Sequence, residues 1–190
     1  MQLSREKTTG ELNLSIRLVR VNSSHAQARF EALSDVRVSK WVFIDLPVSE
    51  AKTKQWCETV GERSSRIDFC FEVEGKAAGF AGLVNINQTS GTCELYIFLH
   101  PSFFSQGLGS KFLYYLLAYG KLELNLRKIS LFVTGDNDKA ISFYERNGFT
   151  TEGVLRRHSW FRGEYRDRII MSIFTDALST DAEPFYQENL

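Results

Sequence analysis

The chain has 190 residues, which fits one domain with a short extension. Hydrophobic residues make up 43% and charged residues 24%, close to the average of globular proteins, which disfavours global disorder. The 23 basic side chains equal the 23 acidic ones, so a nucleic-acid binder that depends on overall charge is disfavoured. No apolar run reaches the roughly 18 residues of a membrane span, and the polar start lacks a signal core. We expect neither a nucleic acid nor a membrane as a partner.

The cysteine pattern indicates a cytoplasmic protein. Cys57, Cys70 and Cys93 are odd in number, widely spaced and not part of a C-x-x-C pair. A disulfide framework and a structural zinc site are therefore disfavoured. We expect the three thiols to be packing residues and predict no metal site.

The first third of the chain reads as one strand followed by helices. Residues 1–10 are polar and predicted to be a flexible segment. Apolar and polar residues alternate over 12–18, the period of a strand with one buried face. A helical region over 22–32, a short helix within 34–41 and a helix opened by Ser49 are predicted next.

The remainder reads as strands interrupted by helices. Apolar, strand-like runs lie at 67–75, 77–86, 93–99 and 128–133, the first two joined as a hairpin around 74–76. Helices are predicted over 107–120 and within 135–149, and two final strands meet at a turn over 162–164. This order predicts an α+β domain over 11–175, in which helices cover a mixed, mostly antiparallel sheet. An acidic, loosely held tail over 176–190 is expected to follow.

The most informative segment joins the strand at 93–99 to the next helix. Pro101 ends the strand, and Gly107-Leu108-Gly109 opens the helix. The amides of such a turn lack partners at the positive end of the helix dipole, a geometry that binds phosphate. The pattern is neither a dinucleotide-binding fingerprint, because Phe112 occupies the third glycine position, nor a Walker A loop. The alternative interpretation of Gly107-Leu108-Gly109 is a tight turn that binds no ligand.

A second motif follows the strand at 128–133. It consists of Asn137, Ala140, Tyr144, Gly148 and Phe149, spaced as N-x-x-A-x-x-x-Y-x-x-x-G-F. With the glycine loop and the strand order, it makes residues 11–174 resemble the GNAT superfamily of acetyl-CoA-dependent N-acetyltransferases. The resemblance implies the GNAT fold, with a twisted central sheet and helices on both faces.

The resemblance also implies a site for acetyl-CoA as cosubstrate. The pantetheine arm is expected to pair with the strand end at Phe98 and Leu99, with Asn137 bonding the same arm. The cofactor loop covers Phe104, Ser105, Gln106, Gly107, Leu108, Gly109 and Ser110. Phe104 stands where the family has Arg or Gln, so we expect weaker acetyl-CoA binding.

Two catalytic residues follow from the same resemblance. Tyr144 is the candidate acid that protonates the leaving thiolate; the alternative is a core tyrosine. Glu94 is the candidate base, because it is an ionisable residue in a mainly apolar strand; the alternative is an exposed carboxylate. His100 is a second candidate base. His25 and His158 are expected to be structural or solvated.

The acceptor is less well defined. The regions before the first hairpin and at the C-terminus resemble both the RimJ/RimL-type branch, which acetylates protein N-termini, and the branch that acetylates nucleotide-linked amino sugars. Five arginines within 13 residues suit sugar-nucleotide phosphates or form a solvated face: Arg156, Arg157, Arg162, Arg166 and Arg168. Trp41 and Trp56 suit stacking on a sugar or base, or anchor the core. A small-molecule amine, such as an amino sugar, is the preferred acceptor; a protein N-terminus and a silent acyl-CoA-binding module are the alternatives. A homodimer is plausible by resemblance.

Overall fold

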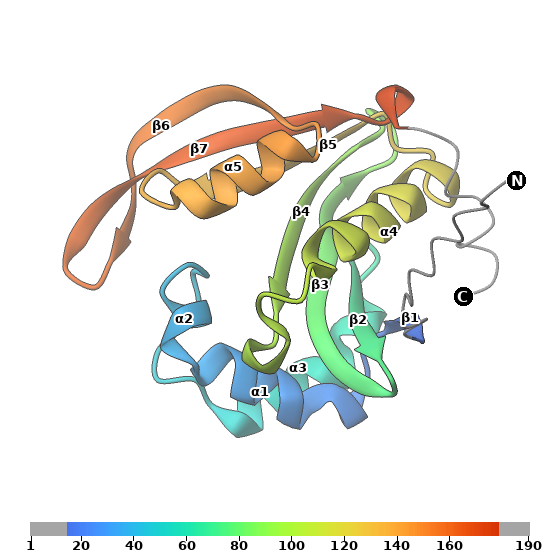
Figure 1. Ribbon diagram of the computed structural model, residues 1–190, viewed down its shortest axis with the longest axis vertical. Coiled ribbons are helices and arrows are strands. Elements are labelled where there is room, and N and C mark those ends of the chain that lie inside the picture. Colours follow the sequence, from blue (N-terminus) through green and yellow to red (C-terminus); the bar gives the residue numbers. More distant parts are fainter. Residues whose placement is uncertain (1–14, 179–190) are drawn as a thin grey trace, which may run out of the picture.

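The computed structural model describes residues 15–178, which build one seven-stranded sheet in the order β1-β2-β3-β4-β5-β7-β6 (Figure 1). The strands are β1 (Ile16–Arg20), β2 (Ile67–Val73), β3 (Lys76–Asn87), β4 (Thr92–Leu99), β5 (Lys128–Thr134), β6 (Thr150–Phe161) and β7 (Glu164–Phe174). Every neighbouring pair is antiparallel except β4 and β5, which are parallel. The expected mixed, mostly antiparallel sheet is confirmed.

The helices fall where the sequence predicts them. They are α1 (Ala26–Ser34), α2 (Val36–Ser39), α3 (Glu50–Thr59), α4 (Leu108–Leu122) and α5 (Asp138–Arg146). Ser49 caps α3 by accepting a hydrogen bond from the Lys52 amide. Short 3-10 turns stand at Ser23–His25, Val60–Glu62, Pro101–Phe103 and Thr175–Ala177. Within residues 15–178, no helix is long and apolar enough to cross a membrane.

Two predicted segments fall largely outside the described residues. The flexible segment 1–10 does so entirely, as does most of the acidic tail 176–190. The strand expected over 12–18 begins at Ile16 among the described residues and continues to Arg20.

Side-chain alternation along β2 divides the core into two layers. Phe69 and Phe71 face α4, where the Phe71 ring stacks on Phe112 with centroids 4.2 Å apart. Cys70 faces the other way and packs with Cys57 of α3. Because neighbouring residues of a strand point to opposite faces, one apolar strand joins both layers. Helices therefore cover both faces, with α4 and α5 on one and α1 and α3 on the other (Figure 1).

The three cysteines belong to these layers. Cys57, Cys70 and Cys93 are free thiols, and all are buried. Burial raises the pKa of the Cys70 and Cys93 thiols to about 12, which keeps them protonated and unreactive at neutral pH.

The sheet opens where β4 leaves β5. The two strands pair at only three positions, and the pair of Glu94 with Ser130 is the last. Beyond it, residues 95–99 of β4 keep their β3 partners but have none on β5. The β6–β7 hairpin extends past this opening (Figure 1). The divergence leaves one edge of β4 available to a ligand in the middle of the sheet.

Candidate functional site

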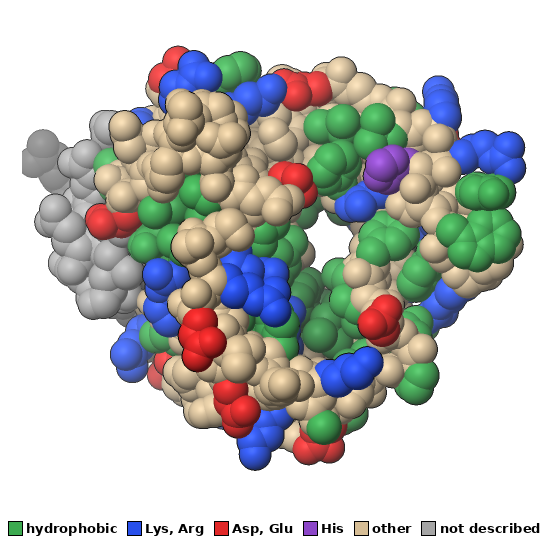
Figure 2. All heavy atoms as spheres, turned by 180° about the vertical axis from the view of Figure 1, so that it is seen from behind, with side chains coloured by type: hydrophobic (Ala, Val, Ile, Leu, Met, Phe, Trp, Pro, Cys, Tyr) green, Lys and Arg blue, Asp and Glu red, His purple; other side chains and the backbone are tan. Residues whose placement is uncertain are grey.

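Two cavities meet at the end of β4. The first, here called the loop groove, has a volume of about 960 Å³ and runs along the start of α4 and along α5. The second, here called the central cavity, has a volume of about 630 Å³ and lies between α1, α2, the β4–β5 opening and β7. Both are lined by Ile97, Phe98, Leu99, Asn137 and Tyr144, among others. Seen from behind, an opening edged by apolar and basic side chains passes through the molecule (Figure 2).

The start of α4 forms one end of the loop groove. Its N-cap is Gly107, which has φ of 72° and provides no side chain to bond the first amides of the helix. A Cβ at Gly107 would meet no atom within 4 Å, so the backbone here faces open space. Positive φ favours glycine, and an uncapped helix start attracts anions. The geometry matches the phosphate-binding turn predicted from the sequence.

Most of the predicted cofactor residues line this groove. They are Phe98, Leu99, Phe104, Ser105, Gly107, Leu108, Gly109, Ser110 and Asn137. Gln106 does not line it, because its Nε2 donates to the Ser102 carbonyl oxygen over 3.0 Å and ties the side chain to the loop. Gln106 therefore offers its backbone to the turn, while its side chain is engaged elsewhere.

The groove also receives positive charge that the loop itself lacks. Its basic lining residues come from α2, its C-cap and α5: Arg37, Lys40, Lys139 and Arg146. The Arg37 guanidinium lies 5.4 Å from the centre of the Phe104 ring, beside the position where a basic residue was expected. Asp136 and Asp138 offset part of this charge. The start of α4 has no side-chain cap, and four basic side chains line the same groove, of which Arg37 pairs with Asp35. Such a groove suits the pyrophosphate and phosphate groups of acetyl-CoA.

The open edge of β4 supplies the pairing surface. The His100 amide donates to the Ala78 carbonyl oxygen over 2.9 Å, so the N–H group of His100 points toward β3. Because backbone polar groups alternate along a strand, the amide of Leu99 points toward the β4–β5 opening. This is the strand end at which the resemblance places the pantetheine arm of acetyl-CoA.

Tyr144 stands between the two cavities. Its ring packs edge-on against Phe143 at 5.2 Å and tilts against Phe149 at 5.6 Å. Burial raises the pKa of the Tyr144 phenol well above its usual value, so the hydroxyl stays protonated at neutral pH. Among residues 15–178, no group forms a hydrogen bond with this hydroxyl. A protonated phenol without a partner is free to donate into the site.

Asn137 begins the helix that holds Tyr144. Its Oδ1 accepts a hydrogen bond from the Ala140 amide over 3.3 Å and so caps α5. Asn137 lines both cavities, and its Nδ2 group is a donor that the cap does not use. The two motif residues, Asn137 and Tyr144, thus reach the site from the same helix.

Glu94 stands at the apex of the β4–β5 opening and lines the central cavity. The side-chain amide of Asn85 donates to its Oε1 over 2.9 Å. Asn85 has φ of 52° and lies in a bulge of β3, where the register shifts between Val84 and Asn87. The bulge redirects the side chain onto its neighbour strand, a common use of bulges beside functional sites.

A buried ionic network lines the central cavity and was missed from the sequence. Arg66 makes two hydrogen bonds of 2.6 Å to Asp68, whose side chain is fully buried. The Tyr96 hydroxyl donates to the same carboxylate over 2.5 Å. Gly82 makes room for the network, because a Cβ there would lie 2.4 Å from the Tyr96 ring. The available sequence signal was weak, because Asp68 is one of two acidic residues, with Glu72, in the apolar strand β2.

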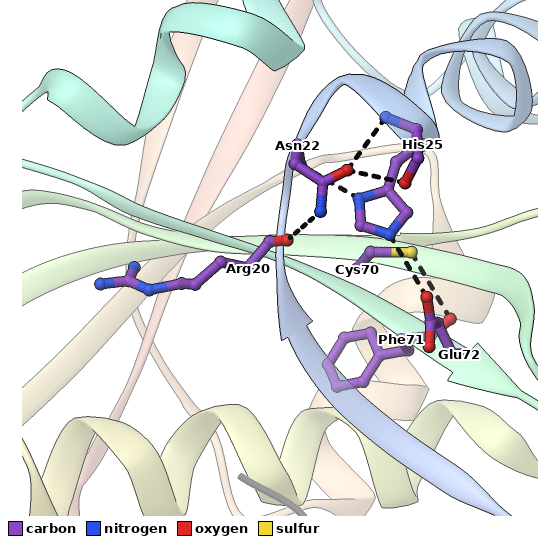
Figure 3. A network of polar contacts seen from close by, with 7 residues as sticks. Arg20, Asn22, His25, Cys70, Phe71 and Glu72 are labelled. Carbon is purple, nitrogen blue, oxygen red and sulfur yellow. Dashed lines mark hydrogen bonds and ion pairs between the residues drawn. The ribbon is translucent and has the colours of Figure 1, made fainter.

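The histidines take other positions. His100 caps the turn after β4, accepting from the Ser102 amide over 3.3 Å, and lines neither cavity. His25 closes a capping box with Asn22, and its Nε2 lies 3.4 Å from Glu72 (Figure 3). His158 is exposed on β6 and stacks parallel to Phe132. His25 therefore has the structural place expected for it.

Some of the residues predicted to contact the acceptor line the central cavity, and others do not. Trp41 and Trp56 both line the central cavity. Of the five clustered arginines, only Arg168 reaches it. Arg156 instead pairs with Asp167 at 2.6 Å on the hairpin surface. Arg166 shares the face of Arg168, because alternate residues of a strand point the same way, but it lies closer to the hairpin turn and pairs with Asp136 at 3.5 Å.

Comparison with known proteins places the chain in a family. Residues 30–149 match the Acetyltransferase (GNAT) family. The chain is 37% identical over 106 residues to the spermidine N(1)-acetyltransferase of Escherichia coli strain K12, which is 56% of this chain and 57% of that protein. It is 24% identical over 161 residues to the SPbeta prophage-derived uncharacterized N-acetyltransferase YokL of Bacillus subtilis strain 168. This match covers 85% of this chain and 89% of that protein. The chain thus spans little more than half the length of the first relative.

The solved structures agree with the fold. Spermidine N-acetyltransferase from Vibrio cholerae, in complex with CoA and spermine, superposes with a TM-score of 0.78 at 23% identity, covering 85% of this chain and 96% of that chain. The expected fold is confirmed, and acetyl-CoA is the cosubstrate that GNAT acetyltransferases use. From its matching residues and its sheet, this chain belongs to the Acetyltransferase (GNAT) family.

Proposed function

We propose that the protein is an N-acetyltransferase that moves the acetyl group of acetyl-CoA to a primary amine of a small molecule. One observation carries the proposal: the loop groove and the central cavity share a wall at Leu99 and Tyr144. A donor seated in the groove and an acceptor seated in the cavity would meet there. The chemistry needs such a junction, since direct transfer brings both substrates to one carbon atom.

Acetyl-CoA supplies a thioester whose carbonyl carbon bonds to the amine nitrogen as its bond to sulfur breaks. The amine must give up a proton, and Glu94 at the apex of the opening is the base proposed to take it. The Leu99 amide is proposed to stabilise negative charge on the carbonyl oxygen. Tyr144 is proposed to donate its hydroxyl proton to the thiolate, which leaves as the thiol of CoA.

The acceptor class is the finer part of the proposal. The aromatic lining of the central cavity, with Trp41, Trp56 and Tyr96, supports a small molecule with a flat or ring-shaped face. An amino sugar fits this description. The relatives named for spermidine support a small amine in general.

The test is mass spectrometry of products after incubation with acetyl-CoA and a panel of amines. The panel holds amino sugars with and without a nucleotide, aminoglycosides, polyamines and peptides with free N-termini. A gain of one acetyl group on a small amine supports the proposal. Acetylation of peptides alone would overturn the small-molecule assignment. Binding of acetyl-CoA with no product on any amine would favour a silent acyl-CoA-binding module.

A further inference from the structure

The central cavity holds more positive than negative charge. Its charged lining residues are Arg29, Arg37, Arg66, Arg168 and Glu94. Arg66 is neutralised by Asp68 and Arg37 by Asp35. In the described part of the chain, no carboxylate oxygen lies within 4.0 Å of a guanidinium nitrogen of Arg29 or Arg168. Neither guanidinium group therefore forms an ion pair within residues 15–178, although Glu94 lines the same cavity.

Arg29 is held against aromatic rings. Its guanidinium carbon lies 3.8 Å from the centre of the Trp56 ring and 5.3 Å from that of Phe98. Its Nη1 atom is buried and has no hydrogen-bond partner among residues 15–178. Stacking on aromatic faces offsets part of the penalty for removing a cation from water. Arg29 as a whole is partly exposed, and an anion would offset the remaining cost of its partial burial.

Arg168 of β7 is also held against aromatic rings, and its Nη2 donates to the Phe132 carbonyl oxygen over 3.4 Å. Its guanidinium carbon lies 4.7 Å from the centre of the Phe43 ring and 4.8 Å from that of Phe132. Its Nε atom is buried without a hydrogen-bond partner in the described structure. Burial lowers the pKa of Arg168, while nearby Glu94 opposes that change. One oxygen of Glu94, Oε1, accepts a hydrogen bond from the side-chain amide of Asn85.

The phosphates of the donor do not explain these two cations. Arg29 and Arg168 line the central cavity but not the loop groove, which has its own basic residues around the start of α4. An anion bound by Arg29 or Arg168 would therefore belong to the second substrate.

We infer that the acceptor carries a carboxylate or phosphate group besides its reacting amine, and that Arg29 and Arg168 bind this oxyanion. The inference rests on the proposed function and narrows its acceptor class. Guanidinium groups bind such oxyanions through paired N–H donors. A polyamine would instead bring further positive charges toward two cations that have no ion-pair partner among the described residues, and like charges in a partly desolvated cavity repel. The cavity thus selects against polyamines.

The first experiment measures binding without turnover. Four probes of similar length differ in the group opposite the amine: 3-aminopropylphosphonate, 4-aminobutanoate, butylamine and 1,4-diaminobutane. Two of the three tryptophans line the cavity, so tryptophan fluorescence reports occupancy, with and without saturating CoA. We expect at least tenfold tighter binding of one or both anionic probes than of the diamine, and the two anionic probes distinguish carboxylate from phosphate. Equal or tighter binding of the diamine overturns the inference.

The second experiment uses variants. Arg29→Met and Arg168→Met should each weaken binding of the preferred anionic probe at least tenfold while changing butylamine binding less than twofold. Arg29→Lys should keep part of the affinity, because it keeps the charge. Arg20→Met is the matched control, since Arg20 also stacks on aromatic rings, those of Phe69 and Tyr119, but does not line the cavity. Unchanged anion binding in both cavity variants overturns the inference.

The two proposals fail in distinguishable ways. If the protein binds acetyl-CoA and acetylates 1,4-diaminobutane or spermidine with a higher kcat/KM than either anionic amine, the acetyltransferase assignment stands and the oxyanion inference falls. If the anionic probes bind preferentially but acetyl-CoA does not bind, the oxyanion site stands and the acetyltransferase assignment falls.

Discussion

Asn85 and Glu94 are joined by a side-chain hydrogen bond of 2.9 Å that runs from a bulge of β3 to the apex of the β4–β5 opening. The bond fixes one carboxylate oxygen and leaves the other available to an incoming amine. It makes Asn85 a positioning residue for the proposed base. The pair therefore separates two effects, the chemistry of the carboxylate and its orientation.

Glu94→Gln should lower kcat about 100-fold or more, the range of a lost general base, with little change in the Kd of acetyl-CoA. The measurement is steady-state kinetics over a range of pH. A variant with the rate and pH profile of the wild type would remove Glu94 as the base.

Asn85→Gly should lower kcat/KM about fivefold, which corresponds to a net hydrogen bond of about 1 kcal/mol. Glycine accepts the φ of 52° at this position, so the change removes the bond without adding strain. Asn125→Gly is the control, because Asn125 also has positive φ, 50°, and lies outside both cavities. Equal effects of the two substitutions would show that Asn85 does not act through Glu94.

Tyr144→Phe should lower turnover while leaving the Kd of acetyl-CoA within about twofold, since the phenol contributes a proton and little binding. Burial raises the pKa of this phenol above its ordinary 10.0, so Tyr144 stays protonated, and kcat should not fall through its ionisation below pH 10. The check is the kcat–pH profile of both proteins. Unchanged turnover in the variant would remove Tyr144 as the acid.

Gly107→Ala should raise the Kd of acetyl-CoA about tenfold or more. The added methyl group projects into open space in the loop groove, where a phosphate would approach the backbone. Gly163→Ala in the β6–β7 turn is a matched control, with φ of 84° and equally open surroundings. Both changes carry the same backbone strain, about 1 kcal/mol. Calorimetric titration should show weaker binding for Gly107→Ala alone; equal losses would indicate strain as the cause.

The local parts of this site were predictable from the sequence. Gly107, Asn137 and Tyr144 belong to short motifs whose spacing reflects one turn or one helix, and the structure brings all three to the same groove. Helix and strand boundaries followed for the same reason, because periodicity and caps act over a few residues.

The charged lining was not predictable, because it is assembled from distant segments. Arg37 of α2 lies against Phe104, and Arg29 of α1 lies against Trp56 of α3 and Phe98 of β4. These contacts depend on how the helices cross the sheet, which no local pattern encodes. The role of Asn85 depends on a bulge, and one inserted residue in a strand leaves no clear signal.

The buried Arg66–Asp68–Tyr96 network leads to a prediction about stability. Asp68→Asn should reduce the free energy of unfolding by about 3–5 kcal/mol, because it leaves the half-buried Arg66 cation without its partner. Denaturant unfolding followed by circular dichroism measures the loss. A loss below about 1 kcal/mol would mean that the network contributes little.

The same network makes stability depend on alkaline pH. Burial raises the pKa of the Tyr96 phenol above its ordinary value of 10.0, with Asp68 adding to the effect. Below pH 10, both the folded and the unfolded chain keep the proton, and Tyr96 adds no pH dependence. Above pH 10, the unfolded chain releases the proton while the folded chain retains it, so rising pH favours unfolding. The denaturant concentration at the unfolding midpoint should therefore decrease as the pH is raised beyond 10. In Tyr96→Phe this decrease should be less steep. An unchanged slope in that variant would show that Tyr96 titrates normally and that the site is wetter than its burial implies.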